Sequence, residues 1–345
     1  MFNLLVITKL ILLSSFIFAQ KRDDYSKKID SLIHTELPNS KHKFDGVILI
    51  SKNGKTVYST SVGYSDRENR KKIKLNDKFA IMSISKQITS VLVLKEAEKK
   101  HIDLQAPIKK YLPNLEQPWA DSVCVYQLLN HTSGIKALDK PLTSKPGKVF
   151  NYSDLSYILL GKVLEFSTKK SYAELANNLF KDLKMKNTQC YVNSMTSLIK
   201  SYEIKDNQWD VEKIKILPDD LPAFGIISTA KDINTWNQAL HQGKLLQPEM
   251  YNRMISYSIK AQHIVFGEKE VGYGFGIRIN DEGKVHYIGH TGAGYGFTST
   301  NLYFPEEKVS IIILENKRHK EMKFSYFFQY ELKNLILKSS LLNKF

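Results

Sequence analysis

The placement of the β-rich runs constrains the fold most, because they gather at both ends of the chain and leave the middle helical. Residues 47–50 and 56–62 are such runs, and they flank Asn53-Gly54, a strong hairpin signal. Four more follow later in the chain, over residues 275–279, 285–288, 298–304 and 309–314. One sheet can accommodate strands from both ends. We therefore expect an α+β fold with a mixed or antiparallel sheet, flanking helices and a mainly helical lobe, roughly residues 80–245, inserted in it.

Helical periodicity and capping signals fill that middle. Apolar residues recur at helical spacing from Ile84 to Leu92, so we expect a helix over residues 83–99. Capping boxes at residues 171–174 and 229–232 open two more helices, and a further helical pattern covers residues 324–337. No Pro-rich or Gly-rich linker and no repeat divides the sequence, so we expect residues 20–345 to form a single domain.

The first residues predict a secretory signal peptide over residues 1–19. Leu10–Phe18 is a short apolar run, Lys9 precedes it, and Ala19 is a small residue suited to cleavage. The run is short for a membrane span, and no later stretch is apolar enough to be one. We therefore expect a periplasmic or secreted protein that begins near Gln20 and keeps no stable membrane span.

The composition is that of a globular protein, with 42% hydrophobic residues, 25% charged residues and a formal net charge of +15. Such a charge could attract acidic partners such as cell-wall polymers, although a solvated basic surface is the simpler interpretation. The densest basic clusters, residues 67–74 and 317–323, lack the interleaved aromatic residues that bind nucleic acids. Cys124 and Cys190 sit among apolar neighbours, which favours two buried free thiols over the disulfide that a secreted location would permit.

Ser83-Ile84-Ser85-Lys86 is the first candidate for chemistry. Positions three apart share a helix face, so the Ser83 hydroxyl and the Lys86 ammonium would be neighbours. A serine needs a base or a charged partner to become a nucleophile, and a helix N-terminus stabilises negative charge that develops there. The same Ser-x-x-Lys pattern begins at Ser40, Ser133, Ser167, Ser197 and Ser228. Only Ser83 follows an apolar run and starts a long apolar-faced helix.

Tyr152-Ser153-Asp154 is the second candidate, because it follows Pro146-Gly147 and leads into a helix. A phenol in a cationic pocket loses its proton more easily and can serve as a base. The alternative is structural: Ser153 or Asp154 caps the helix, and Tyr152 only contributes packing. The local sequence by itself favours this alternative.

His290-Thr291-Gly292 is the third candidate and lies in a glycine-rich segment, residues 289–297. Glycines let another backbone or a ligand approach a strand closely. His286 and His290 would share a strand face, but no third ligand with suitable spacing completes a metal site, so we expect neither a metal nor a cofactor. The sequence also lacks the Gly-x-Ser-x-Gly of the α/β-hydrolases.

The order and context of these three elements resemble those of the β-lactamases and penicillin-binding proteins, which carry Ser-x-x-Lys, a Ser-Asp-Asn element and a Lys-Thr-Gly strand. With tyrosine in the second element, the chain is similar to the branch that holds class C β-lactamases, DD-peptidases, D-aminopeptidases and related esterases. The matching stretches cover residues 79–89, 128–135, 146–165, 223–236 and 289–297.

This resemblance implies a role for each residue. Ser83 attacks a carbonyl group and becomes acylated, while Lys86 and Tyr152 share the proton transfers. Thr291 and Gly292 line the strand beside the substrate. The backbone N–H groups of Ser83 and Ala293 form the oxyanion hole. His131, in the matching stretch 128–135, is expected to form hydrogen bonds at a helix end and to have no catalytic role.

Two residues depart from the family pattern. Asp154 stands where the family commonly has asparagine, and a carboxylate accepts hydrogen bonds but cannot donate them. His290 stands where the family often has lysine, and an unperturbed imidazole is mostly neutral at pH 7. Both changes disfavour anionic amide substrates, such as penicillins, more than small neutral esters.

These observations predict a secreted serine hydrolase that acts through a Ser83 acyl-enzyme on an ester or a D-amino-acid-type amide or peptide. A DD-carboxypeptidase or a class C-type β-lactamase is the first alternative. A non-catalytic, penicillin-binding sensor-like module is the second. The expected partner is a small-molecule or peptide acyl substrate, cell-wall peptides included, and not a nucleic acid.

Overall fold

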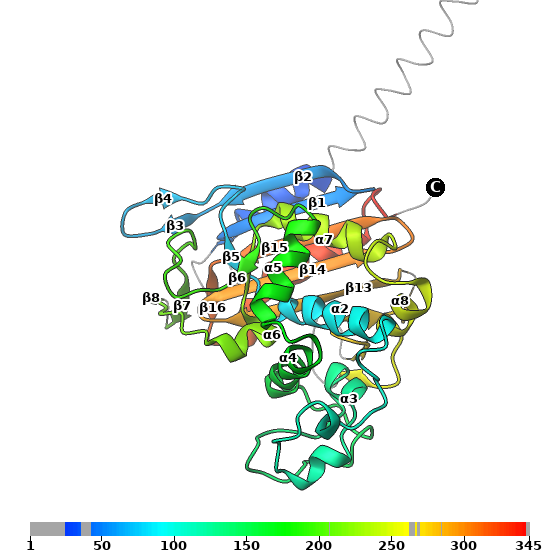
Figure 1. Cartoon of the computed structure of the whole chain (residues 1–345). Coiled ribbons are helices and arrows are strands. Elements are labelled where there is room, and N and C mark those ends of the chain that lie inside the picture. The colour runs from blue at the N-terminus through cyan, green and yellow to red at the C-terminus, as the bar shows by residue number, and fades with distance from the viewer. Residues whose placement is uncertain are drawn as a thin grey trace, which may run out of the picture.

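A computed structural model describes residues 25–35, 43–206, 208–261, 266–267, 270–283 and 285–342 (Figure 1). The expected signal peptide and its cleavage point lie outside the described residues. Within the described ranges, no helix combines the length and the apolar character needed to cross a bilayer.

One eight-stranded antiparallel sheet forms the centre of the molecule (Figure 1). Its strands, in hydrogen-bonded order, are β10 (Lys260–Ala261), β11 (Val271–Tyr273), β12 (Arg278–Asn280), β13 (Tyr287–Gly294), β14 (Phe297–Phe304), β15 (Val309–Glu315), β1 (Gly46–Lys52) and β2 (Lys55–Val62). Strands from the two parts of the chain meet where β15 pairs with β1, with Gly46 opposite Glu315 and Lys52 opposite Val309. The expected α+β fold, with an antiparallel sheet built from both chain ends, is confirmed.

Three smaller sheets lie around this one. They are β16 (Lys317–His319) with β7 (Tyr202–Lys205) and β8 (Gln208–Val211), β3 (Tyr64–Asp66) with β4 (Lys71–Lys72), and β5 (Phe79–Ala80) with β9 (Ile226–Ser228) and β6 (Gln189–Cys190). The β5-β9-β6 sheet matters most for the site, because β5 leads directly into the turn that carries Ser83.

Helices cover both faces of the central sheet. They are α2 (Ser85–Glu98), α3 (Val125–Leu129), α4 (Asp154–Thr168), α5 (Tyr172–Asp182), α6 (Leu221–Phe224), α7 (Ala230–His241), α8 (Pro248–Met254), α9 (Met322–Ser325) and α10 (Phe327–Leu337), with a further helix over residues 25–33. Short 3₁₀ turns are η1 (Met82–Ile84), η2 (Ile108–Lys110), η3 (Pro118–Asp121) and η4 (Pro218–Asp220). In Figure 1 the lobe that contains α3 and α4 extends below the sheet, while α7 packs on β1 and β15.

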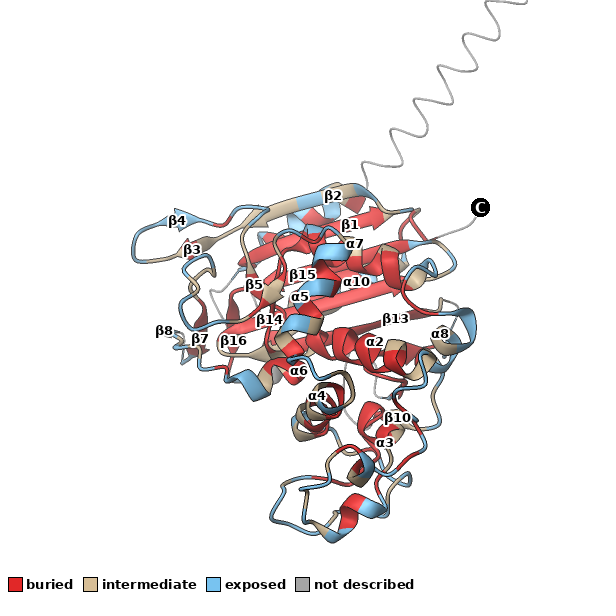
Figure 2. Ribbon diagram, in the orientation of Figure 1, coloured by how far each residue is buried: buried red, intermediate tan, exposed pale blue. Residues whose placement is uncertain are grey.

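The alternation of side chains along β15 gives the sheet two apolar faces. Ile312 and Leu314 join the larger core between the sheet and the helical lobe. Ile311 and Ile313 join a second core beneath α10 and the helix over residues 25–33. Successive strand residues point to opposite faces, so a strand covered on both sides is buried along its whole length (Figure 2). This explains why residues 309–314 form a continuous apolar run.

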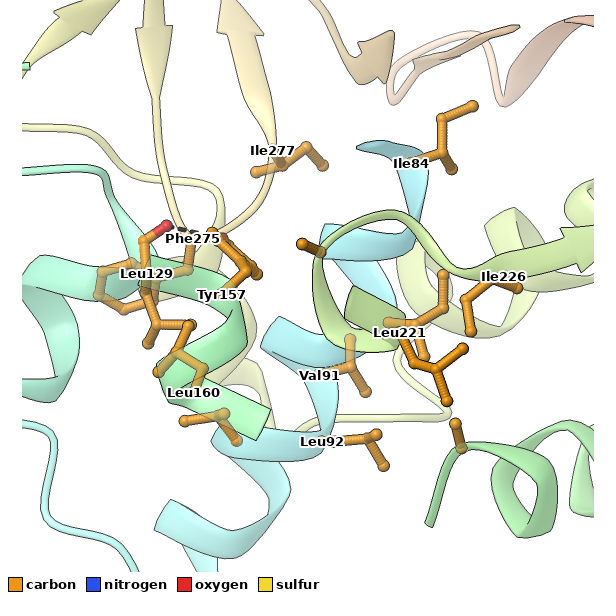
Figure 3. Packing of buried hydrophobic residues seen from close by; sticks show 14 of the residues in the cluster. Ile84, Val91, Leu92, Leu129, Tyr157, Leu160, Leu221, Ile226, Phe275 and Ile277 are labelled. Atoms are coloured by element: carbon orange, nitrogen blue, oxygen red, sulfur yellow. Dashed lines mark hydrogen bonds between the residues drawn. The ribbon is translucent and has the colours of Figure 1, made fainter. Parts of the chain in front are cut away.

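Helix α2 is the centre of the larger core and carries the first motif. Figure 3 shows it between two groups of apolar side chains, which come from α3 and α4 on one side and from α6 and β9 on the other. Polar groups of α2 are also buried and hydrogen-bonded: Thr89 donates to the Pro222 carbonyl (2.6 Å), and Gln87 accepts from Trp236 (3.2 Å). Buried polar groups need such partners, so these bonds fix the helix between the lobe and the sheet.

Several expected boundaries were wrong, each for a local reason. The expected strand over residues 285–288 continues as β13 to Gly294, through the glycine-rich segment. The strand expected over residues 275–279 is reduced to β12, because Gly276 has φ +69° and turns the chain. The C-terminal helix is broken at Tyr326, whose backbone is not helical and which separates α9 from α10. Ser83 itself lies in η1, one turn ahead of α2.

Candidate active site

Ser83 lies in the 3₁₀ turn η1, where the chain passes from β5 into α2. Ile84 N donates to the Ile81 carbonyl (3.2 Å) and closes the turn. Met82 has φ +50°, a left-handed conformation that residues other than glycine seldom adopt, so the backbone next to Ser83 is strained. The neighbouring residues on both sides are buried, whereas Ser83 is partly exposed. The hydroxyl is therefore presented at the start of a buried helix.

Lys86 is fully buried and joins the parts of the site. Its ammonium donates to Ser83 Oγ (3.1 Å), to Asp154 Oδ1 (2.6 Å) and to the Ala223 carbonyl (2.9 Å). These three acceptors match the three protons of an ammonium group. Burial alone would lower the pKa of Lys86, but Tyr152 and Asp154 together outweigh it and raise that pKa above its ordinary value. Lys86 is therefore a cation at neutral pH.

Tyr152 and Asp154 flank the residue that caps α4. Ser153 Oγ accepts from Ser156 N (3.3 Å), so the expected cap is present. Lys86 Nζ lies 4.9 Å from the centroid of the Tyr152 ring, and Tyr152 is 37% exposed. The Asp154 side chain is 48% exposed although one of its oxygens binds Lys86. The structure therefore contains the helix cap of the structural interpretation, and it also places Tyr152 and Asp154 beside Lys86.

Strand β13 brings the third motif close to Ser83, the candidate nucleophile. Within the described residues, β12 pairs with β13 only as far as Gly289, whereas β14 pairs with it as far as Gly294. A Cβ on Gly292 would lie 2.5 Å from the Ile81 carbonyl oxygen and 2.8 Å from Met82 Cβ, so the strand passes directly against the Ser83 turn. Ala293 follows and is partly exposed. A strand edge that presents N–H groups beside a nucleophile is the arrangement that an oxyanion hole needs.

His290 and Thr291 both lie in the wall of the site. His290 is fully buried, its Nδ1 donates to the Thr291 carbonyl (2.6 Å), and its Nε2 is hydrogen-bonded to the Tyr273 hydroxyl (2.9 Å). Its ring centroid is 6.4 Å from that of Tyr152. Thr291 is 9% exposed, and its hydroxyl interacts with Tyr326. A direct contact between His290 and a substrate would require the imidazole to leave these partners.

His131 has the hydrogen-bonding role expected of it. It is fully buried just after α3, and its Nδ1 accepts from Ser153 N (3.2 Å) at the start of α4. Its ring also lies against Tyr152, with ring centroids 4.3 Å apart. His131 is therefore a neighbour of the candidate base as well as part of a helix end.

Arg278 is a site residue that sequence reasoning missed. It is 2% exposed on β12, and its guanidinium carbon lies 5.7 Å from the Tyr152 ring centroid and 5.3 Å from that of Tyr273. It brings to the site a positive charge that the argument from His290 did not count. The signal was an arginine inside the apolar run of residues 275–279, because arginine is almost never fully buried without a partner.

The other Ser-x-x-Lys serines have different surroundings. Ser133 and Ser228 are fully buried and hydrogen-bonded to other hydroxyl groups. Lys200, which follows Ser197 in its motif, pairs with carboxylates elsewhere. Ser40 lies outside the described residues. Within the described part of the chain, the hydrogen bond between Ser83 and Lys86 is the one that joins the serine and the lysine of such a motif.

The other expectations about ligands and thiols are answered only in part. Both cysteines are free thiols in the structure, and Cys190 is buried, whereas Cys124 is partly exposed. Burial raises the pKa of the Cys190 thiol to about 12, so it is not a reactive thiolate. The described residues contain no group of three or more acidic, histidine or cysteine side chains that could hold a metal ion.

At this site a serine at the start of a helix lies beside a lysine ammonium and a phenol, and a strand edge passes the same turn. On an antiparallel sheet joined to a helical lobe, this arrangement defines the class of penicillin-recognising serine proteins. The profile of the family described as Beta-lactamase matches residues 27–331, and this chain belongs to that family.

Individual relatives agree with this assignment. Protein flp of Staphylococcus aureus (strain MW2) is 27% identical over 325 residues, which cover 85% of this chain and 64% of that protein. The chain thus spans less than two thirds of the length of this relative.

Solved structures share the fold. The D-amino acid amidase from Ochrobactrum anthropi SV3, in complex with D-phenylalanine, superposes with a TM-score of 0.76 at 20% identity, over 91% of this chain and 99% of the amidase. The D-alanine carboxypeptidase AmpC from Burkholderia cenocepacia gives a TM-score of 0.76 at 19% identity, over 92% of this chain and 99% of the carboxypeptidase. At these identities the likeness concerns the fold.

Proposed function

We propose that this chain is a serine hydrolase that transfers an acyl group to water through an acyl-enzyme on Ser83. One observation carries the proposal: a single buried ammonium, Lys86, contacts the Ser83 hydroxyl, the Asp154 carboxylate and the face of Tyr152. A nucleophile, a charged partner and a candidate base within reach of one another are the signature of covalent catalysis by serine.

The charge on Lys86 supports one assignment of the proton transfers. Tyr152 and Asp154 raise the pKa of Lys86 despite its burial, which favours the charged ammonium and supports a base other than Lys86. Tyr152 is the neighbouring group that remains for this role, and it is exposed enough to meet a substrate. Lys86 then holds the Ser83 oxygen in place and stabilises the negative charge that appears near it.

The proposed reaction has two similar halves. In this proposal Tyr152 acts as its phenolate, beside the Lys86 cation. Ser83 Oγ forms a bond to the acyl carbon while its proton passes to the Tyr152 phenolate oxygen, and the carbonyl oxygen becomes an oxyanion facing the N–H groups of Ser83 and Ala293. The C–O or C–N bond to the leaving group breaks, and the alcohol or amine departs with the proton. Water then attacks the acyl-enzyme by the same route and regenerates Ser83. Loss of one oxyanion-hole donor typically costs on the order of 100-fold in rate.

We propose an ester or a D-amino-acid-type amide as the substrate, and favour the ester. The fold neighbours whose names mention D-amino acids support a D-aminoacyl group. Arg278 weakens the charge argument against anionic substrates, so the ester preference depends mainly on Asp154. Its carboxylate cannot donate a hydrogen bond to a substrate's side-chain amide, which the usual asparagine can do.

A substrate panel on the purified mature protein tests this proposal. The panel contains short-chain p-nitrophenyl esters, D-amino acid amides, D-Ala-D-Ala peptides and a chromogenic cephalosporin. We expect ready hydrolysis of the esters and weak or no turnover of the cephalosporin. Faster turnover of the cephalosporin than of the esters would show that the chain is a β-lactamase and that the argument from Asp154 is wrong.

The sensor-like alternative predicts a different time course. A non-catalytic module either leaves Ser83 unmodified or acylates it and stalls. Intact-mass spectra taken during ester turnover show whether Ser83 carries an adduct. A hydrolase also releases more than one equivalent of product per protein molecule, which distinguishes these cases. Product that stops at one equivalent, with a persistent adduct, would favour the sensor.

We also propose that the protein is exported, on the strength of the apolar Leu10–Phe18 run that ends at Ala19. The mature chain should begin near Gln20 and be recovered from the periplasm or the medium. N-terminal sequencing of the native protein tests this, and an intact Met1 on protein recovered outside the cytoplasm would contradict the cleavage.

A further inference from the structure

His131 contacts three consecutive residues of the segment that carries Tyr152. Its carbonyl oxygen accepts from Asn151 N (2.8 Å), its Nδ1 accepts from Ser153 N (3.2 Å), and its ring centroid lies 4.3 Å from that of Tyr152. We infer that His131 is a positioning residue, which holds the Tyr152 phenol toward Lys86 and Ser83 and thereby sets the rate of acyl transfer. This inference rests on the proposed function, because it concerns the base of that reaction.

The backbone of Tyr152 is not held by helical geometry, although its ring also faces Lys86, Arg278 and Tyr273. Tyr152 lies in irregular backbone just before α4, and it is 37% exposed. Residues 147–149, a little upstream, are exposed as well. The two hydrogen bonds that His131 accepts, from Asn151 N and Ser153 N, hold the residues immediately before and after Tyr152. The ring contact then limits how the phenol can rotate between these two fixed points.

His131 is itself held rigidly. It is fully buried, and its ring lies among Phe150 (5.8 Å between centroids), Tyr157 (5.2 Å) and Tyr273 (4.9 Å). Its backbone is left-handed, with φ +58°, a conformation in which histidine is found more often than most residues. Because His131 is held by its buried neighbours, it can restrict the position of the more exposed Tyr152 ring.

The hydrogen bond from Ser153 N also fixes the tautomer of the His131 ring. A backbone N–H can only donate, so Nδ1 of His131 is the nitrogen without a proton. Two substitutions separate the ring contact with Tyr152 from the hydrogen bond that Nδ1 accepts. His131→Asn keeps an acceptor oxygen at the equivalent place and tolerates the left-handed backbone, but it removes the ring. His131→Phe keeps a ring but leaves Ser153 N without its acceptor.

The experiment measures kcat and KM of both variants on a p-nitrophenyl ester, per active site titrated with a fluorophosphonate. We expect kcat to fall on the order of 10-fold to 100-fold in each variant, while KM stays within about threefold, because a misplaced group slows the chemistry more than it weakens binding. Unchanged kcat in both variants would overturn the inference, and so would a rise in KM alone. If His131→Phe fails to fold, unchanged kcat in His131→Asn is sufficient to overturn it.

His241 provides a matched control. It is also stacked on a tyrosine, Tyr303 (4.2 Å between centroids), and its Nδ1 is hydrogen-bonded to the Tyr251 hydroxyl (2.9 Å), but it lies on α7, away from the site. His241→Asn should reduce thermal stability and leave kcat per titrated site unchanged. A purely structural role for His131 would give the same result in His131→Asn, and would contradict the inference.

The labelling rate of Ser83 separates this inference from the proposed function. A fluorophosphonate reacts with an activated serine whatever its natural acyl donor is. If the wild-type chain is labelled but hydrolyses no ester or amide, the proposed function fails. The inference is then still decided by labelling, which must be slower in the His131 variants than in wild type and in His241→Asn.

Discussion

At the scale of single residues, Lys86 is the side chain that most of the site depends on, because it donates to Ser83, Asp154 and the Ala223 carbonyl at once. Lys86→Met keeps the length of the side chain and removes the charge. We expect kcat/KM on an ester to fall by on the order of 100-fold or more, as on loss of a group that stabilises developing negative charge. The matched control is Lys231→Met, which removes the exposed lysine of the Ser228 motif and should leave kcat/KM unchanged. Equal activity in both variants would contradict the role of Lys86.

Asp154 is the residue that departs most clearly from the family pattern. Asp154→Asn restores an amide donor and removes the carboxylate that helps to raise the pKa of Lys86. We expect the ratio of kcat/KM on a cephalosporin to kcat/KM on an ester to increase. The measurement is the ratio itself, since a general loss of activity cancels in it. A ratio that falls or stays constant would show that Asp154 does not select against amides.

At the scale of elements, the proposed oxyanion hole depends on the close approach of β13 to η1. Gly292→Ala would put a Cβ 2.5 Å from the Ile81 carbonyl oxygen and 2.5 Å from Ser299 Oγ, so the strand has to move away from Ser83. We expect kcat to fall on the order of 100-fold, as when an oxyanion donor is lost. Gly283→Ala is the control, because Gly283 lies in the connection between β12 and β13. A Cβ there meets no atom within 4 Å, so this substitution strains the backbone at φ +131° without pushing a strand away from η1. Wild-type kcat in Gly292→Ala would contradict the assignment of this strand edge.

The same elements show what the sequence could and could not reveal. The hairpin at Asn53-Gly54 and the helix starts at Ser171 and Thr229 were predictable, because each depends on neighbouring residues only. The path of β13 through its glycines was not predictable, because glycine has a low intrinsic preference for strands. The glycines are needed here because the strand packs against a turn that is distant in the sequence. Similarly, the Ala223 carbonyl reaches the site through long-range packing that no local pattern records. For Arg278 the local pattern indicates burial but does not reveal Tyr152 as its neighbour.

At the scale of the whole molecule, buried ionisable groups lie where β1 and β15 pair and so join the two ends of the chain. Glu315 ends β15 opposite Gly46, and burial raises its pKa to about 7, although Lys317 at 3.6 Å and a hydrogen bond from Gln329 act against this. An acid with a higher pKa in the folded state binds its proton more tightly when folded. Its contribution to stability is therefore present at low pH and is lost as the pH rises from its ordinary pKa of 4.5 through about 7.

Glu315→Gln tests this linkage, because glutamine cannot ionise. The free energy of unfolding of the variant, minus that of the wild type, should become more positive between pH 5 and pH 8. Urea unfolding at both values measures the difference, and any constant cost of the substitution cancels in the comparison. A difference that stays constant or becomes more negative would show that Glu315 is ionised in the folded protein throughout this range.

The identity of the nucleophile is tested most directly by mapping a covalent adduct. The purified protein is treated with a fluorophosphonate, digested and analysed by mass spectrometry, alongside the Ser83→Ala variant. We predict one adduct, on the peptide that contains Ser83, and neither labelling nor ester turnover in Ser83→Ala. An adduct on Ser133 or Ser228, or a Ser83→Ala variant that is still labelled at the wild-type rate, would contradict the assignment of Ser83 as the nucleophile.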